Sequence, residues 1–247
     1  MQMIFLETVN KIAESFFDLI FPKFCIGCKK EGFYICQDCK SRLQINYYVF
    51  CHLCKNRIPA DSRCPSHKTA LKFCLSPFSY DNILVKNLIH DFKYRFIKSI
   101  GPELAKFMIQ SLKNSKLLNH LSINKLMCQQ TSELIIVPVP LHKKRLIWRG
   151  FNQSEILAKK ISKELQIDIF SGLKRVKNTL PQIDMADKEQ RQENIKNAFL
   201  CEKSRKLKHK IVILIDDMVT TGATLEECAK TLKKNGAKEV WALTVAK

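Results

Sequence analysis

Apolar positions follow two patterns along the chain, and each predicts a different kind of element. Aliphatic runs at 211–215 and at 134–140, where Pro138 and Pro140 end the second run, are typical of parallel strands that are covered on both faces. Apolar residues at helical spacing predict helices. The predicted helices span 82–96, 101–113, 154–166 and a segment ending at Lys234, and shorter strands are predicted at 73–80, 167–170 and 238–246. This alternation indicates an α/β fold with a mostly parallel sheet.

The longest aliphatic run leads directly into two carboxylates, Asp216 and Asp217. Three threonines and one glycine follow at 220–224, which is more than a helix cap requires, although Thr220 or Thr221 is predicted to cap the next helix. An ordinary turn with solvated aspartates is the plainer interpretation. Open α/β sheets, however, hold ligands at the carboxyl ends of their strands. We therefore predict an anion-binding turn at this junction, where backbone N–H groups are available.

Residues 211–224 resemble the phosphoribosyl pyrophosphate signature of the type I phosphoribosyltransferases over the whole length of that motif. The resemblance implies a Rossmann-like domain in which Asp216 and Asp217 are catalytic and bind the ribose 2′ and 3′ hydroxyls. It also implies that the loop after them binds the 5′-phosphate through N–H groups and threonine hydroxyls. The further substrate-binding residues implied in this stretch are Met218, Val219, Thr220, Thr221, Gly222, Ala223 and Thr224.

Eight of the eleven cysteines fall in the first third of the sequence. Paired C-x-x-C turns can place four ligands around one Zn²⁺ ion. The first predicted zinc site consists of Cys25, Cys28, Cys36 and Cys39, and a similarly spaced second site of Cys51, Cys54, Cys64 and His67, with Cys74 as the alternative fourth ligand. Disulfides and redox pairs are the alternative interpretations, and the sequence leaves open whether one zinc ion binds or two.

The cysteine-rich segment contains too few apolar residues for a core of its own, so metal is expected to supply its folding energy. We predict an N-terminal domain at 1–72, with a helix and a double zinc ribbon, and a second domain at 73–247. The helix at 4–20 is amphipathic and is expected to pack on the protein, with membrane association as the alternative. No stretch is long enough to span a membrane, and we predict a cytoplasmic location, which disfavours disulfides.

Forty-two Lys and Arg residues against 23 Asp and Glu give a formal charge of +19. Such an excess favours polyanionic partners, namely phosphates, nucleic acid or anionic membrane, although charge alone also serves solubility. A basic run with a tryptophan, residues 142–149, follows the strand at 134–140. It suits phosphates, or a nucleic-acid backbone with a stacking ring, and the alternative is a disordered loop. Lys93 and Arg95 suit either a phosphate contact or a solvated helix face.

Three further motifs, together with the zinc ribbon, resemble the ComF family of competence-associated phosphoribosyltransferase-like proteins. The motifs are Arg149-Gly-Phe-Asn-Gln-Ser, Arg175 with Thr179 and Gln182, and Arg191 with Asn194 and Phe199. His67 departs from the family pattern, where a cysteine is expected. In type I phosphoribosyltransferases a mobile loop at the position of 174–198 closes over the ligand. The resemblance adds the substrate-binding residues Pro138, Val139, Pro140, Arg149, Asn152, Gln153, Arg175, Gln182 and Arg191.

The resemblance implies a protein that binds phosphoribosyl pyrophosphate with Mg²⁺ and transfers phosphoribosyl to an acceptor, linked to DNA uptake in natural transformation. The sequence does not identify the acceptor. The alternative is a non-catalytic competence factor that keeps the phosphate site, binds single-stranded DNA and contacts proteins of the uptake machinery. A P-loop ATPase is poorly supported, because no G-x-x-x-x-G-K-[ST] motif occurs.

Overall fold

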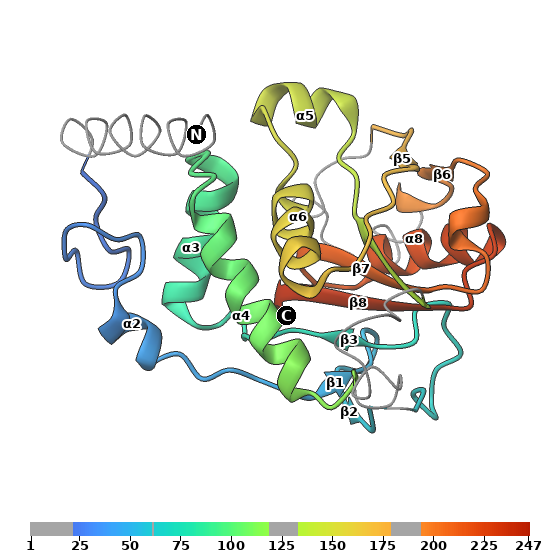
Figure 1. Cartoon of the computed structure of the whole chain (residues 1–247), viewed down its shortest axis with the longest axis horizontal. Coiled ribbons are helices and arrows are strands. Elements are labelled where there is room, and N and C mark those ends of the chain that lie inside the picture. The colour runs from blue at the N-terminus through green and yellow to red at the C-terminus, as the bar shows by residue number, and fades with distance from the viewer. Residues whose placement is uncertain (1–21, 61, 119–132, 179–193) are drawn as a thin grey trace, which may run out of the picture. The chain divides into compact units, whose positions relative to one another are not determined.

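The computed structural model describes residues 22–60, 62–118, 133–178 and 194–247, which belong to two compact units (Figure 1). The first unit ends at Gln44 and the second begins at Ile45. This division differs from the domain boundary predicted after residue 72, because the segment from Ile45 onward supplies strands to the sheet of the second unit. The helix predicted at 4–20 lies outside the described residues.

The described part of the first unit consists of tight turns and one short helix, α2 (Gln37–Ser41). An isolated antiparallel bridge joins Phe24 to Glu31. Besides three cysteines, the buried apolar residues of this described part are Ile35 and Leu43. Two aliphatic side chains are too few to fold such a segment, which agrees with the expectation that metal supplies its stability.

The second unit is built on a six-stranded sheet with the order β2-β1-β3-β8-β7-β4. Its strands are β1 (Val49–Phe50), β2 (Arg57–Ile58), β3 (Cys74–Leu75), β4 (Leu134–Pro138), β7 (Ile211–Met218) and β8 (Glu239–Ala246). The four strands from β3 to β4 in this order are parallel, whereas β1 is antiparallel to both of its neighbours. The sheet is therefore mixed and mostly parallel, which confirms the predicted fold class.

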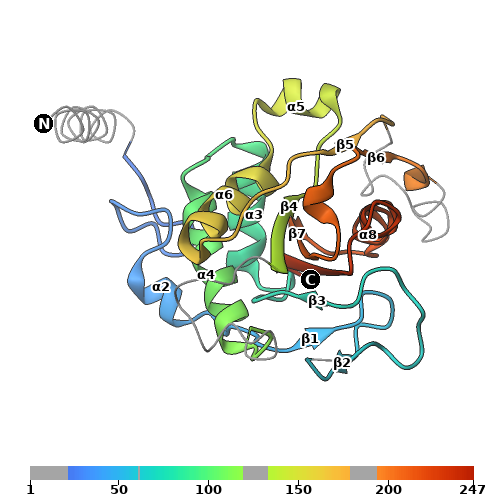
Figure 2. The same cartoon turned by 45° about the vertical axis from the view of Figure 1, so that its right-hand side comes forward.

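Helices cover both faces of the sheet, which explains why its central strands β7 and β8 are buried along nearly their whole length. The helices are α3 (Ile83–Tyr94), α4 (Ile100–Asn114), α6 (Gln153–Leu165) and α8 (Ala223–Lys234). Figure 2 shows α8 on one side of the sheet and the other three helices on the opposite side. Val212 and Leu214 of β7 join the core on the α8 side, while Ile213 between them is buried on the other face.

Three segments differ from the prediction. The strand expected at 167–170 is reduced to one bridge between Ile136 and Ile169. The basic run after β4 forms a helix, α5 (Lys143–Arg149), rather than a loop, and it ends at Gly150 with a φ of 72°. The loop predicted at 174–198 is bounded by two paired strands, β5 (Leu173–Arg175) and β6 (Phe199–Cys201). A short 3₁₀ turn, η5 (Arg205–Leu207), precedes β7.

Candidate functional site

Strand β7 extends past its aliphatic run and carries Asp216 and Asp217 at its carboxyl end. Successive strand residues point to opposite faces, so the two carboxylates have different neighbours. Ser154 Oγ and the Asp217 N–H both donate to Asp216 Oδ1, each at 2.9 Å. Asp217 is buried and its Oδ1 lies 2.7 Å from Lys93 Nζ. The acidic pair is thus held by α6, α3 and its own backbone.

Burial raises the pKa of Asp216 to about 7, and the charge of Asp217 acts in the same direction, against Lys93 and the Ser154 hydrogen bond. The pKa of Lys93 is also raised: burial, the largest single effect, lowers it, but the charge and hydrogen bond of Asp217 together with the charge of Asp216 outweigh burial. The site therefore contains one firmly paired carboxylate and one whose charge is acquired close to neutral pH.

Replacing Asp216 by asparagine is expected to raise the free energy of unfolding at about pH 8, on the order of 2 kcal/mol. The folded pKa, about 7, is above the ordinary value of 3.8, so ionised Asp216 destabilises the folded protein. This destabilisation begins as the pH rises above 3.8, the pKa of Asp216 in the unfolded chain, and is complete only above about 7, its pKa in the folded protein. The amide oxygen of Asn can still accept from Ser154 Oγ. Urea denaturation should therefore show a larger gain at about pH 8 than at about pH 4.5; a loss at both values contradicts the prediction.

The residues at 220–224, here called the threonine turn, connect β7 to α8. Helix α8 begins after its N-cap residue Gly222, whose φ of 77° is left-handed. Because glycine has no side chain, the helix lacks a side-chain hydrogen bond from its N-cap position. The prediction that Thr220 or Thr221 is the N-cap residue is therefore wrong, because Gly222 occupies that position. Thr221 still contributes, because its Oγ1 accepts from the Ala223 N–H at 3.3 Å. A helix N-terminus with a glycine turn favours a bound anion.

The acidic pair and the threonine turn line one cavity of about 230 Å³. Basic side chains line the same cavity: Lys93, Arg145, Arg149 and Arg175. Two nitrogens facing this region, Arg149 Nε and Gln153 Nε2, are buried and lack a hydrogen-bond partner among the described residues. A buried donor without an acceptor is costly, so an acceptor-rich ligand would relieve that cost.

Most of the predicted substrate-binding residues lie around this cavity. Those that line it are Val139, Pro140, Arg149, Gln153, Arg175, Asp216, Asp217, Met218, Val219, Thr220, Gly222 and Thr224. Pro138 pairs within the sheet, and Asn152 positions the chain by donating to Val139 O at 3.0 Å. Thr221 and Ala223 line a different cavity on α8. Gln182 and Arg191 lie outside the described residues.

Some residues of the site were not assigned to it from the sequence. Tyr94, Leu141, Arg145, Ser154 and Leu225 also line the cavity. Ser154 is the last residue of the Arg149 motif, and Arg145 belongs to the basic run, so both carried a signal. Lys93 had been placed near a phosphate or in solvent, and its close partner is instead Asp217.

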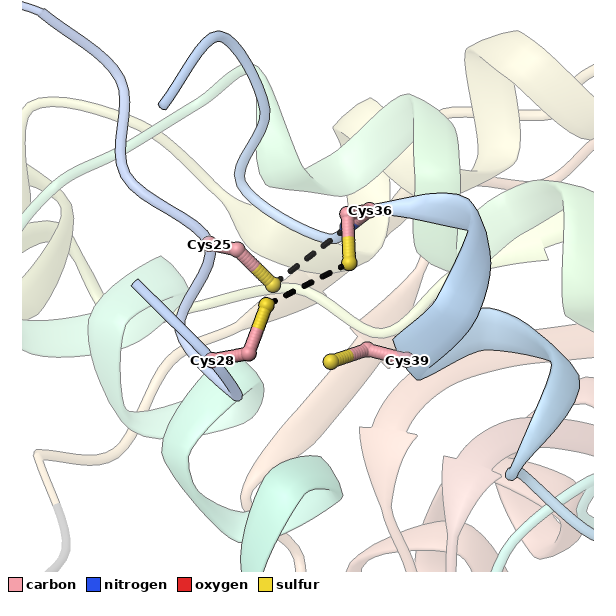
Figure 3. A group of neighbouring side chains, drawn as sticks. All are labelled: Cys25, Cys28, Cys36 and Cys39. Atoms are coloured by element: carbon pink, nitrogen blue, oxygen red, sulfur yellow. Dashed lines mark hydrogen bonds between the residues drawn. The ribbon is translucent and has the colours of Figure 1, made fainter. Parts of the chain in front are cut away.

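In the first cluster the four predicted cysteines, Cys25, Cys28, Cys36 and Cys39, come together (Figure 3). All their sulfurs lie within 4.8 Å of one another, and those of Cys28 and Cys36 are 3.5 Å apart. Zn–S bonds of ~2.3 Å place sulfurs about 3.8 Å apart in a tetrahedron. The Cys36 N–H also donates to Cys25 Sγ at 3.3 Å, as a charged thiolate favours. These residues fit a zinc ion.

The second cluster brings together Cys51, Cys54, Cys64 and His67, within the unit that holds the sheet. The sulfurs of Cys54 and Cys64 are 3.8 Å apart, and His67 Nδ1 lies 3.4 Å from Cys64 Sγ and 3.7 Å from Cys51 Sγ. Tetrahedral zinc predicts about 3.8 Å for sulfur pairs and about 3.5 Å for sulfur to nitrogen. The residues therefore fit zinc. The alternative ligand Cys74 is buried in β3, and no disulfide joins cysteines of the described ranges.

Comparisons with known proteins agree with this geometry. The phosphoribosyl transferase domain family matches residues 152–247, which contain the acidic pair and the threonine turn. Competence protein F of Haemophilus influenzae is 32% identical over 228 residues, covering 90% of each chain. The chain belongs to the ComF family. The chain is also similar to DNA utilization protein YhgH of Escherichia coli K12, with 27% identity over 85% of this chain and 96% of that protein. Competence protein ComFC of Bacillus subtilis is 26% identical over 82% of this chain and 79% of that protein.

The ComF family assignment extends beyond the phosphoribosyl transferase match, which begins at Asn152. Strand β4, helix α5 and both cysteine clusters precede that residue, yet the similarity to Competence protein F covers 90% of the chain. Across the described ranges, no helix has the length and apolar character needed to cross a membrane.

Proposed function

We propose that this protein binds phosphoribosyl pyrophosphate and transfers its phosphoribosyl group to a nitrogen nucleophile. The observation that carries the proposal is the junction of β7 and α8, where two carboxylates and a left-handed glycine turn line one cavity. The membership of the ComF family and the phosphoribosyl transferase match support the same substrate class.

The 5′-phosphate would lie at the threonine turn. Helix α8 has 12 residues, so its N-terminus presents backbone N–H groups and a partial positive charge to an anion. The ribose hydroxyls would donate to Asp216 and Asp217, which stand directly before the turn. A ribose with a 5′-phosphate matches this arrangement, because its phosphate would accept from the N–H groups of the turn and its hydroxyls would donate to the carboxylates.

The diphosphate would lie against the basic side of the cavity. Arg149 Nε and Gln153 Nε2 are buried donors without acceptors in the described structure, and phosphate oxygens would supply them. Arg145 and Arg175 line the same cavity and add positive charge. These cations would stabilise the negative charge that develops on pyrophosphate as it leaves.

In the transfer, the bond from ribose C1 to a pyrophosphate oxygen breaks, and pyrophosphate leaves with the electron pair. The acceptor nitrogen forms a bond to C1 and loses a proton to the departing pyrophosphate. Asp216 and Asp217 stabilise the positive charge that develops on the ribose. Asp216 and Asp217 would hold Mg²⁺ together with ligand oxygens. Lys93 pairs with Oδ1 of Asp217, so Oδ2 would be the oxygen that Asp217 contributes. When bound, Mg²⁺ would neutralise diphosphate charge.

Helix α5 favours a second function, contact with single-stranded DNA. Ile147 and Trp148 are 82% and 61% exposed on this basic helix. The Trp148 ring lies 5.6 Å from the Phe96 ring and 6.4 Å from the Tyr94 ring, measured between centroids. Exposed rings among cations stack on unpaired bases. The relatives named for competence and for DNA utilization support a role beside proteins that take up DNA.

Titration of the protein with phosphoribosyl pyrophosphate and Mg²⁺, and separately with a single-stranded oligonucleotide, tests both functions. We expect saturable binding of phosphoribosyl pyrophosphate whose affinity changes little between about 50 and about 200 mM salt, and oligonucleotide binding that weakens more than tenfold over the same range. Release of pyrophosphate in the presence of an acceptor would support transfer. Absence of phosphoribosyl pyrophosphate binding at both salt concentrations would exclude the main proposal and leave the DNA-binding one.

A further inference from the structure

The threonine turn separates two cavities. Thr220, Gly222 and Thr224 line the cavity of the acidic pair, while Thr221 and Ala223 line the other. The second cavity is also lined by His52 and by Lys68 and Thr69, from the segment that carries the second metal cluster. On the reverse side of the turn, this second cavity is therefore lined by His52, Leu53, Lys68 and Thr69.

Lys55 makes the first contact between this segment and the turn. Its Nζ donates to the carbonyl oxygen of Thr220 at 2.5 Å. Lys55 directly follows the cluster residue Cys54 and has a left-handed φ of 63°. Its N–H donates to Cys51 O at 2.8 Å, which closes the tight turn between the two cysteines. The position of the Lys55 side chain thus depends on how the cysteine turn is folded.

His52 makes the second contact, through close packing. A Cβ on Gly222 would meet the His52 ring and its Cβ at 2.5 to 2.9 Å, closer than such atoms approach. The His52 side chain is buried, and it lies between Cys51 and Cys54 in the sequence. Glycine at 222 is therefore required twice, for its left-handed backbone and for the space that His52 occupies.

Glu226 makes the third contact, from the first turn of α8. Its carboxylate accepts from the Ala70 N–H at 2.8 Å and from the Leu71 N–H at 3.0 Å. Its Oε2 also lies 3.7 Å from His52 Nε2. Glu226 is itself tied to the threonine turn, because its N–H donates to Gly222 O at 2.9 Å. Both ends of residues 51–71 are in this way connected to the start of α8.

The segment has little regular structure of its own that could hold these contacts in place. Between Cys51 and Leu71 the described strand is β2, which has two residues. The cross-link that a metal ion would form among Cys51, Cys54, Cys64 and His67 joins both ends of the segment. The ligand distances fit zinc, as described above.

We propose that the second metal cluster positions the threonine turn, so that metal at Cys51, Cys54, Cys64 and His67 sets the affinity of the turn for a sugar phosphate. The proposal rests on the proposed function, since it assigns the 5′-phosphate to that turn. His52 and Lys55 are positioning residues that contact the turn and no reacting atom. The proposal assigns no such role to the first cluster, which belongs to the other compact unit.

The test compares the Cys54→Ser/Cys64→Ser variant with a matched Cys28→Ser/Cys39→Ser variant, each altering one of the two clusters. Zinc content should fall from two ions per chain to one in both. Calorimetric titration with ribose 5-phosphate should show at least about a tenfold weaker affinity in the first variant and wild-type affinity in the second. Wild-type affinity in both variants would overturn the inference and leave the proposed function intact.

Two further measurements separate positioning from misfolding. Lys55→Met removes no cluster residue, so it should keep both zinc ions and weaken ribose 5-phosphate binding about three- to tenfold. Hydrogen exchange at residues 219–224, measured without any sugar phosphate, should be faster in the Cys54→Ser/Cys64→Ser variant than in wild type. Unchanged exchange overturns the inference, even if the wild-type protein binds no ribose 5-phosphate and the proposed function fails.

Discussion

Replacing both Asp216 and Asp217 by asparagine is expected to abolish binding of phosphoribosyl pyrophosphate, weakening it by at least about 100-fold. In the proposed function, the two carboxylates accept from the ribose hydroxyls and would hold Mg²⁺. Asparagine has nearly the same shape, so Ser154 Oγ and Lys93 Nζ each keep an oxygen to donate to. Calorimetric titration of the variant should give no measurable heat of binding.

The fold of this double variant should remain intact, because its two effects on stability oppose each other. The change removes the ion pair between Lys93 and Asp217, but it also removes the destabilising charge of Asp216. A double variant at two exposed acids, Asp81→Asn with Asp168→Asn, loses the same net charge and should bind like wild type. Equal affinity of all three proteins would show that the ribose does not bind at the acidic pair.

Loss of metal from the first cluster is expected to unfold residues 22–44 while the sheet of the second unit persists. The described buried residues of this unit are three cysteines with Ile35 and Leu43, far too few to fold it alone. Structural zinc contributes about 10 kcal/mol or more to such small segments. In a Cys36→Ser variant, trypsin should cut rapidly after Lys29, Lys30, Lys40 and Arg42, leaving a stable larger fragment.

Cys201→Ser is the matched control for this experiment, because Cys201 lies in β6 and belongs to neither cluster. The control should keep wild-type zinc content and wild-type resistance to trypsin. If Cys36→Ser resisted trypsin as well as the control, metal would not hold the first unit together.

The elements that could be predicted from the sequence are the long ones with a clear pattern of apolar residues. The aliphatic run before Asp216 predicted β7, and its position next to two acids and a threonine turn indicated where a ligand would bind. Short elements such as β1 and β2 escaped prediction, because two residues show no periodicity. Helix α5 escaped as well, since its seven residues contain no buried face.

Contacts between distant segments could not be predicted from one sequence. Lys93 reaches Asp217 from a different helix, and Lys55 reaches Thr220 from the metal-binding segment. The spacing of Cys51, Cys54, Cys64 and His67 predicted a common cluster, and the structure brings them together. The spacing could not predict that this cluster lies in the same unit as the sheet, which is why the predicted boundary after residue 72 differs from the division after Gln44.

A crystal structure of the protein with ribose 5-phosphate tests the central claim most directly. The account predicts a phosphate within hydrogen-bond distance of the backbone N–H groups at 221–224, and ribose hydroxyls donating to Asp216 and Asp217. A phosphate bound only at the basic helix α5, with the acidic pair still paired to Lys93 and Ser154 alone, would contradict it.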